Sequence, residues 1–260
     1  MISGICNLPL VPLRSEPSEK SEMVTQVLFG EIYDLLEEKN GWSKIMLQND
    51  HYTGWCTSKM LQILTGEKID DFLSRKPYIT KSPVLICKAI DSENENLILP
   101  AGSRLYFCED DSDKFEVCIP EKKYWKFPGE NSSFDPDITN LSNMFLNVPY
   151  LWGGKSVMGI DCSGLVQLIF SLLGVSLPRD AGQQALEGVI VSGIEDSEVG
   201  DLAFFENPEG KIVHVGIVLE NMKILHSSGS VHIDDLDNIG IFSRKLSIYT
   251  HKLYKIKRIL

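Results

Sequence analysis

The hydrophobic pattern of the chain changes near residue 138, and this change limits the possible folds. Before it, apolar residues form short strand-like runs that polar turns interrupt. After it, apolar residues first recur at helical spacing, as in Ile138, Leu141 and Phe145, and strand-like runs dominate only after Gly200. Helices followed by strands predict an α+β domain over residues 138–260, and not a sheet of βαβ units.

Residues 1–64 consist of short strand-like runs. One run ends at Gly30, and two later runs flank Asn40-Gly41, a pair that readily adopts the positive φ angles of a tight hairpin. Closely spaced short strands with such turns predict a small β-barrel over residues 1–64.

A second block of strand-like runs, residues 77–128, resembles a copy of the first barrel, although the sequence identity between the two is weak. We expect the charged segment Glu67 to Lys76 to form a connecting helix. A stretch rich in Pro, Gly, Asn and Ser, from Pro128 to Asp137, is predicted to be a linker. The predicted fold class is therefore multidomain, with two small all-β barrels followed by an α+β domain.

Length and charge limit the partners. A chain of 260 residues is long enough for about two domains, or three small ones. Its 25 basic and 36 acidic residues argue against nucleic acid or an anionic membrane as the main partner. No apolar stretch approaches the roughly 18 residues of a membrane span. No basic residue precedes Arg14 and no long apolar core follows the start, so we expect no secretory signal and a cytoplasmic location. An exported protein whose signal had been removed would look the same.

Six cysteines occur, and a disulfide framework is typical of shorter, secreted chains. Because most of them have apolar neighbours, we expect buried free thiols. Neither a CxxC pair nor a histidine cluster with metal-ligand spacing is found along the sequence, so we predict no zinc site and no cofactor. The cysteines are Cys6, Cys56, Cys87, Cys108, Cys118 and Cys162.

The segment Gly159-Ile160-Asp161-Cys162-Ser163-Gly164 places a thiol in the first turn of a predicted helix, with Asp161 as a possible N-cap. Backbone N–H groups and the positive end of the helix favour thiolate at this position. The same N–H groups can stabilise an oxyanion formed when a carbonyl is attacked. Cys162 on its own fits a nucleophile or one more buried thiol equally well, and the histidines favour the nucleophile.

In Ile212-Val213-His214-Val215-Gly216, strict alternation directs His214 away from the face that carries Val213 and Val215. A ring on the less apolar face beside a glycine suits a general base, although a lone strand histidine is often structural. A second strand containing His226 follows a turn near Glu220-Asn221. A loop with an odd number of residues is expected to place His226 directly opposite His214, whereas a two-residue loop would send the rings to opposite faces.

Opposite His214, His226 would fix the tautomer and orientation of the base as the third member of a triad. His232 is a rival third member. We expect His51 and His251 to be unconnected with this site.

Together these features resemble the NlpC-type cysteine peptidases of bacterial cell walls, which have a reduced papain-like fold. The resemblance covers Leu141 to Leu260 and rests on PYLWGG, GIDCSGLVQ, LPRD, VGDL and HVGI, in that order. It implies that Cys162 is the nucleophile, His214 the general base and His226 the polar third residue.

The N-terminal barrels resemble bacterial SH3-like domains. The whole chain looks like the γ-D-glutamyl-L-diamino acid endopeptidases, which carry two such domains before the catalytic one. The resemblance implies cleavage of murein peptides between D-Glu and the diamino acid, with a requirement for a free N-terminal L-Ala. The implied role is the recycling of cell-wall peptides.

A free α-ammonium group needs an anionic or acceptor-rich pocket, because burying it unpaired is costly. We expect Asp161 to supply this pocket, with N-capping as the alternative role. By analogy with the subfamily, Glu22 and Tyr52 of the first barrel are expected to contribute across a domain interface, with a solvated carboxylate and packing beside Trp55 as the alternatives.

Further candidate substrate-binding residues surround the nucleophile, and each also has a structural interpretation. Ser163 would bind substrate or satisfy the helix start, Tyr150 would support the oxyanion, and Trp152 would line the groove. Arg179 and Asp180 would contact substrate or form a structural ion pair.

Two other functions fit less well. One is an exported hydrolase acting on intact stem peptides, with the barrels as wall anchors. The other is a non-catalytic wall-binding protein, which the ordered presence of Cys162, His214 and His226 disfavours. No oligomeric state follows from the sequence.

Overall fold

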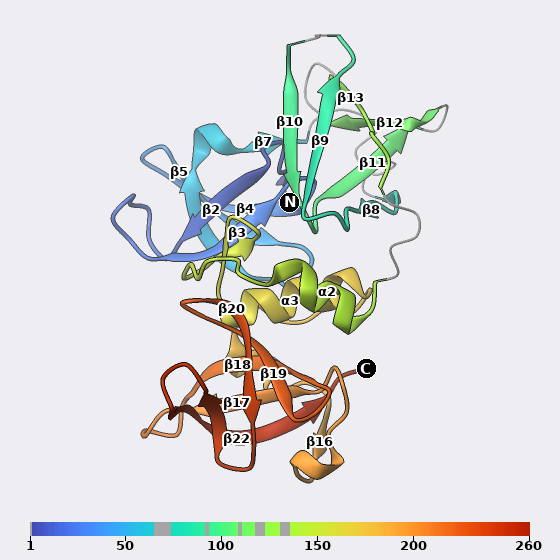
Figure 1. Ribbon diagram of the computed structural model, residues 1–260. Helices are drawn as coiled ribbons and strands as arrows, with labels where there is room; N and C mark the ends of the chain where they lie inside the picture. Colours follow the sequence, from blue (N-terminus) through green and yellow to red (C-terminus); the bar gives the residue numbers. More distant parts are fainter. Residues whose placement is uncertain (1, 65–73, 92–93, 109–110, 118–122, 131–135) are drawn as a thin grey trace. The chain divides into compact units, whose positions relative to one another are not determined.

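The computed structural model describes residues 2–64, 74–91, 94–108, 111–117, 123–130 and 136–260 (Figure 1). The chain divides into two compact units, residues 1–134 and 135–260. Among the described residues, no helix has both the length and the apolar character needed to cross a bilayer.

The first sheet of unit 1 has seven strands in the order β3-β2-β6-β5-β4-β1-β7. Lys39 pairs with Trp42 across Asn40-Gly41, whose φ angles are 51° and 79°, so the predicted two-residue hairpin is confirmed. Apolar side chains on alternate positions, such as Leu13, Ile45 and Leu47, form its core. The strands are β1 (Ile2–Ile5), β2 (Leu10–Arg14), β3 (Met23–Leu28), β4 (Ile32–Lys39), β5 (Trp42–Leu47), β6 (Thr53–Thr57) and β7 (Gln62–Ile63).

The second sheet of unit 1 has six strands in the order β10-β9-β13-β12-β11-β8. Leu85, Leu99, Phe115 and Trp125 belong to its core. The strands are β8 (Tyr78–Ile79), β9 (Val84–Ala89), β10 (Asn96–Pro100), β11 (Arg104–Cys108), β12 (Asp111–Val117) and β13 (Lys123–Lys126).

The two sheets of unit 1 meet at Gly30. The N–H of Arg104 donates to the carbonyl of Phe29 at 2.8 Å, and the Tyr106 hydroxyl donates to the carbonyl of Gly30 at 3.1 Å. Gly30 has φ 77°, and a Cβ there would collide with the carbonyl of Arg104, so this contact requires glycine.

Several sequence predictions concern residues outside the described ranges. They include most of the helix expected over Glu67 to Lys76, half of the linker and the residue Cys118. Of the other cysteines, Cys6, Cys56, Cys87 and Cys162 are free and buried, which confirms the prediction for these four.

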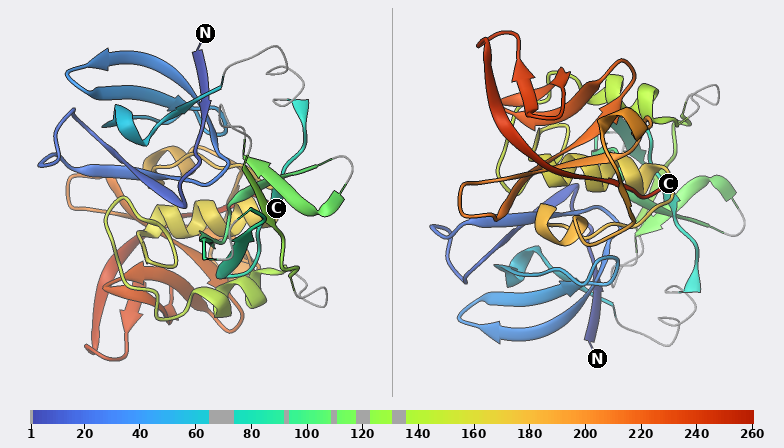
Figure 2. Two further views of the ribbon diagram at one scale, coloured as in Figure 1. Left: turned by 90° about the horizontal axis from the view of Figure 1, so that it is seen from above. Right: turned by 90° about the horizontal axis from the view of Figure 1, so that it is seen from below.

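Unit 2 begins with the two helices predicted from the sequence. Helix α2 (Ile138–Phe145) is capped by Asp137, which accepts from the N–H of Asn140, and it ends before Pro149. Helix α3 (Cys162–Leu172) is followed by Gly174 with φ 84°. Nearly every residue of α3 is buried, because the helix packs against strands β18 (Ile212–Leu219) and β19 (Lys223–Ser228) (Figure 2).

Seven strands of unit 2 form an antiparallel sheet in the order β16-β22-β17-β18-β19-β20-β21. Strand β21 pairs with both β20 and β22, so six of the strands close on themselves. The remaining elements are the short pair β14 (Lys155–Ser156) and β15 (Gly159–Ile160), helix α4 (Ala181–Gln184), and strands β16 (Val189–Val191), β17 (Leu202–Glu206), β20 (Ser230–Leu236), β21 (Gly240–Ser243) and β22 (Ile248–Arg258).

Candidate active site

Cys162 is the first residue of helix α3, as predicted, and its side chain lies beside strand β18. Its sulfur receives hydrogen bonds from the backbone N–H groups of Val215 and Ser163. Val215 follows His214 in the chain, so the candidate nucleophile and the candidate base are neighbours in space.

Burial and, to a smaller extent, the negative charge of Asp161 raise the pKa of the Cys162 thiol, and its net value is about 11. The hydrogen bonds from Val215 and Ser163 and the charge of Arg179 lower this pKa, but they do not outweigh burial. The thiolate expected from the helix start is therefore not the resting state at neutral pH. A neighbouring base must remove the proton.

His214 and His226 form the predicted pair, with Nε2 of His214 2.9 Å from Nδ1 of His226. Burial lowers the pKa of His214 well below its usual value, with further lowering by the charges of His251, His226 and His232. Burial likewise lowers the pKa of His226 to about 3. Both rings are therefore neutral at pH 7, and Nδ1 of His214 is the ring nitrogen not used in their contact.

The register that joins these rings differs from the predicted one. Leu219 pairs with Lys223 across a three-residue loop, so the loop is odd and both rings share a face, as expected. The same register, continued, places His226 opposite Gly216 and only diagonal to His214. The prediction of direct opposition was wrong by two residues, and the long imidazole side chains span the diagonal.

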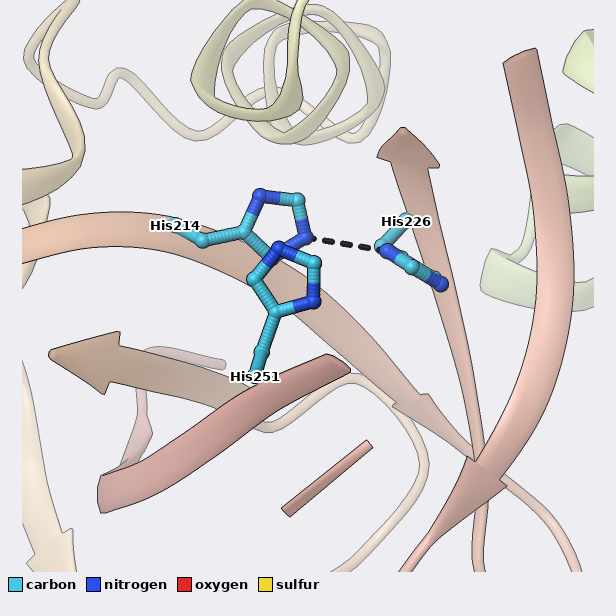
Figure 3. A group of neighbouring side chains, drawn as sticks. All are labelled: His214, His226 and His251. Carbon is cyan, nitrogen blue, oxygen red and sulfur yellow. Dashed lines mark hydrogen bonds between the residues drawn. The ribbon is translucent and has the colours of Figure 1, made fainter. Parts of the chain in front are cut away.

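His251 belongs to this site, contrary to the sequence analysis. Its ring stacks on that of His214, with centroids 4.0 Å apart and planes inclined by 20° (Figure 3). It comes from β22, which pairs with β17, the neighbour of β18, and also with β21, where the sheet closes. Sequence patterning does not reveal such closure.

Asp234 was also missed. Its Oδ2 lies 3.4 Å from Nε2 of His226 and 3.3 Å from Nε2 of His232, the rival third member. Two signals were available in the sequence. Gly229 favours a tight turn that pairs His226 with His232, and Asp234 follows His232 by the two-residue spacing of one strand face.

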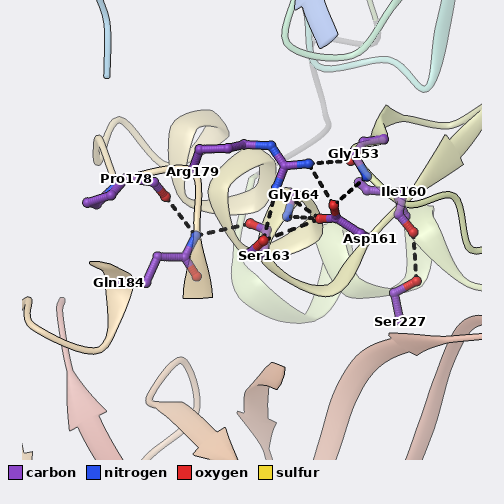
Figure 4. Close-up of polar contacts among 10 residues, drawn as sticks. Gly153, Ile160, Asp161, Ser163, Gly164, Pro178, Arg179, Gln184 and Ser227 are labelled. Carbon is purple, nitrogen blue, oxygen red and sulfur yellow. Dashed lines mark hydrogen bonds and ion pairs between the residues drawn. The ribbon is translucent and has the colours of Figure 1, made fainter. Parts of the chain in front are cut away.

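A second polar cluster surrounds Asp161 at the start of α3 (Figure 4). Oδ1 of Asp161 caps the helix by accepting from the N–H of Gly164 at 2.7 Å, and Oδ2 accepts from the N–H of Gly153 at 2.8 Å. Arg179 donates to both oxygens, from Nη1 at 3.0 Å and from Nη2 at 2.7 Å. This geometry supports N-capping, the alternative role considered for Asp161.

The expected ion pair of Arg179 is present, with Asp161 as a partner. Nη1 of Arg179 also donates to the hydroxyl of Ser163 at 2.9 Å, which places Ser163 in the same cluster. Gln184, which the sequence analysis did not identify, donates from Nε2 to the carbonyl of Ser163 at 3.0 Å.

Glycines shape the loop before α3. A Cβ on Gly164 would collide with the carbonyl of Gly154, and one on Gly154 would collide with the carbonyl of Gly159. These positions need glycine because backbone segments pass too close for a side chain. Trp152 and Met158 of the same loop are 59% and 78% exposed.

The remaining predicted site residues are placed as follows. Burial, together with the charges of Cys162 and Asp161, raises the pKa of Tyr150 to about 12, so its hydroxyl stays protonated at neutral pH. Asp180 is exposed and precedes α4. Glu22 and Tyr52 belong to unit 1, in β-rich segments, and their contribution to the site stays a prediction.

Two families of domains match the chain. The NlpC/P60 family matches residues 147–249, and the bacterial dipeptidyl-peptidase Sh3 domain matches residues 13–61. A solved NlpC/P60 family protein from Bacillus cereus superimposes with a TM-score of 0.82 at 22% identity, and the match covers 99% of each chain.

Curated relatives match over most of the chain. A γ-D-glutamyl-L-lysine dipeptidyl-peptidase from Bacillus cereus is 28% identical over 244 residues, which are 85% of this chain and 72% of the relative. A protein of the same name from Bacillus subtilis is 30% identical over 248 residues, which are 90% of this chain and 80% of the relative. The chain therefore belongs to the NlpC/P60 family and carries an SH3-like domain of the bacterial dipeptidyl-peptidase type before its NlpC/P60 domain.

Proposed function

We propose that this chain is a cysteine peptidase that cleaves murein peptides between γ-D-Glu and the diamino acid, with Cys162 as nucleophile. One observation carries the proposal: the thiol at the start of α3 is held by the N–H of Val215, next to a neutral His214 that contacts His226. The names of the two Bacillus relatives support this choice of bond.

In this mechanism, Nδ1 of His214 takes the thiol proton as the sulfur attacks the γ-carbonyl carbon of D-Glu. The hydroxyl of Tyr150, which keeps its proton at neutral pH, donates to the developing oxyanion. The C–N bond breaks, the amine of the diamino acid leaves with the proton from His214, and a thioester remains. His214 then takes a proton from water, which hydrolyses the thioester and restores the thiol.

Selection of a free L-Ala amine is the finer part of the proposal. Both oxygens of Asp161 already accept from Arg179 and from backbone N–H groups, so this carboxylate holds the loop and the start of α3 in place. We therefore assign the ammonium group to Asp180, the exposed carboxylate that follows Arg179. Glu22 and Tyr52 of the SH3-like domain remain proposed contributors.

Two structural proposals accompany this function. Residues 77–128 would be a second SH3-like domain, which is supported by their separate sheet and core. Unit 2 would have a papain-like fold, which is supported by a helix that begins with the thiol and packs on the strand carrying the base. A requirement for free L-Ala would favour a cytoplasmic recycling role, because intact wall peptides have this amine blocked.

The test is hydrolysis of L-Ala-γ-D-Glu-diaminopimelate beside its N-acetylated form, with Cys162→Ala as the inactive control. We expect wild-type protein to cleave only the free peptide, and Asp180→Asn to raise KM more than it lowers kcat. Equal rates on both peptides would overturn the ammonium pocket. Failure of the wild type to cleave either peptide would overturn the proposed function.

A further inference from the structure

Three potential metal ligands, one of which is His226, converge on one side of the sheet. Strands β19 and β20 pair so that His226 lies directly opposite His232. Asp234 is two residues beyond His232 on the same face of β20. The cluster formed by His226, His232 and Asp234 therefore depends on strand pairing, which explains why no ligand spacing was evident along the sequence. One ligand atom from each residue lies within 4.8 Å of the others.

The two distances from Asp234 to the histidines of this cluster match those between ligands of one metal ion. Oδ2 of Asp234 lies 3.4 Å from Nε2 of His226 and 3.3 Å from Nε2 of His232. These are longer than the about 2.7–2.9 Å of a charge-assisted hydrogen bond. In a tetrahedral zinc site with bonds of about 2.0–2.1 Å, neighbouring ligand atoms are about 3.3–3.4 Å apart.

The tautomer of His232 points to a cation. Its Nδ1 lies 2.7 Å from the backbone carbonyl of Ser230, which can only accept, so Nδ1 carries the proton. In the neutral ring, Nε2 then presents a lone pair to a carboxylate oxygen, and two acceptors face each other. A cation between them removes this conflict, and a bond from the other ring nitrogen to a backbone carbonyl is usual for metal-bound histidine.

We propose that Nε2 of His226, Nε2 of His232 and a carboxylate oxygen of Asp234 form a site for a divalent transition metal ion of the zinc type. The His232 side chain is 35% exposed, and so it provides a route from solvent. Three protein ligands leave a fourth position for water.

Metal binding at this site inhibits the peptidase, an inference that rests on the proposed function. With Nε2 of His226 on the metal, its proton is released to solvent. Nδ1 of His226 then takes the proton from Nε2 of His214. Nδ1 of His214 in turn takes a proton from solvent, so that one proton is released and one is taken up. The general base now carries a proton on the nitrogen that must accept the thiol proton.

Binding is tested with Co²⁺ as a spectroscopic probe on the full-length Cys162→Ser variant, in which no thiol ligand is present at the site. We expect one equivalent of Co²⁺ to give the visible absorption of a tetrahedral site and Zn²⁺ to displace it. His232→Gln and the isosteric Asp234→Asn should each weaken Co²⁺ binding at least about tenfold, with folding checked by thermal melting. His51→Gln, in unit 1, is the matched control and should bind as the parent does.

A rival cluster shares His226 with this one and consists of His214, His226 and His251. Loss of Co²⁺ binding in His251→Gln but not in Asp234→Asn would overturn the proposed ligand set. The absence of Co²⁺ binding by all of these proteins would also overturn the proposal.

Inhibition is tested separately on wild-type protein with the free tripeptide substrate. We expect Zn²⁺ to lower kcat, a chelator to restore it, and His232→Gln to be less sensitive to Zn²⁺ relative to its own metal-free rate. Zn²⁺ binding without inhibition would overturn the coupling to His214. An inactive metal-free wild type would overturn the proposed function instead, while the Co²⁺ measurement would still report on the site.

Discussion

Two polar clusters lie beside Cys162, and they differ in charge: one is built on an ion pair and the other on neutral rings. The cluster around Asp161 joins a buried carboxylate to a buried guanidinium, and each carboxylate oxygen accepts from several donors. The cluster around His214 consists of neutral imidazole rings that share protons with one another and with Asp234. The first has one arrangement of its hydrogen atoms, whereas the second has several. The Asp161 cluster is thus a fixed frame, whereas protons can move between ring nitrogens in the His214 cluster.

The largest effect on activity is expected when His214, the base that carries the movable proton, is replaced. His214→Gln should lower kcat/KM by at least about 10³-fold, because a thiol with a pKa near 11 needs its neighbouring base to lose its proton. Hydrolysis of the free tripeptide measures the effect, and the melting temperature should stay near that of the parent. Retention of more than a tenth of the activity would show that His214 is not the base.

Disruption of the fixed frame around Asp161 is expected to lower the stability of unit 2. Arg179→Met leaves the Asp161 carboxylate buried without its charged partner, so we expect the free energy of unfolding of unit 2 to fall by about 3–5 kcal/mol. Denaturant unfolding measures it. The double variant Asp161→Asn/Arg179→Met should recover part of the loss, and no recovery would show that the charge pair is not the cause.

A smaller effect on activity is expected at Asp234, which contacts the side of His226 that faces away from His214. Asp234→Asn removes the charge that faces Nε2 of His226, so the orientation of His214 weakens and kcat should fall by about tenfold, with KM unchanged. Kinetics in a chelator-containing buffer exclude the metal effect. Asp234→Glu should recover part of kcat, and an equal loss in both variants would point to a structural role.

The stacked ring should matter least. His251→Ala removes a ring contact with His214, a type of contact worth about 0.5–1.5 kcal/mol, and should lower kcat/KM by roughly threefold to tenfold. His251→Phe keeps a stacked ring and should lose less. If the two variants are equally impaired, the imidazole of His251 acts through its nitrogens and not through stacking.

Local patterns were sufficient to predict part of the site, with capping as the alternative role of Asp161, but not the whole imidazole cluster. Capping by Asp161, the start of α3 at Cys162 and the shared face of His214 and His226 follow from residues close together in the sequence. The register of β18 and β19 depends on Asn221 and Met222, which adopt positive φ without glycine, so sequence gave no reason to choose between odd loops. The position of His251 depends on the pairing of β22 with β17 and β21, a property of the whole unit.

The glycines that shape the loop before α3 also determine where substrate preference can change. Gly154, Gly159 and Gly164 are closed to any side chain, whereas Trp152 and Met158 between and beside them are well exposed. A combinatorial library restricted to Trp152 and Met158 would therefore diversify the rim of the loop at little cost in folding. The same loop thus combines positions that are closed to any side chain with positions that are open to solvent.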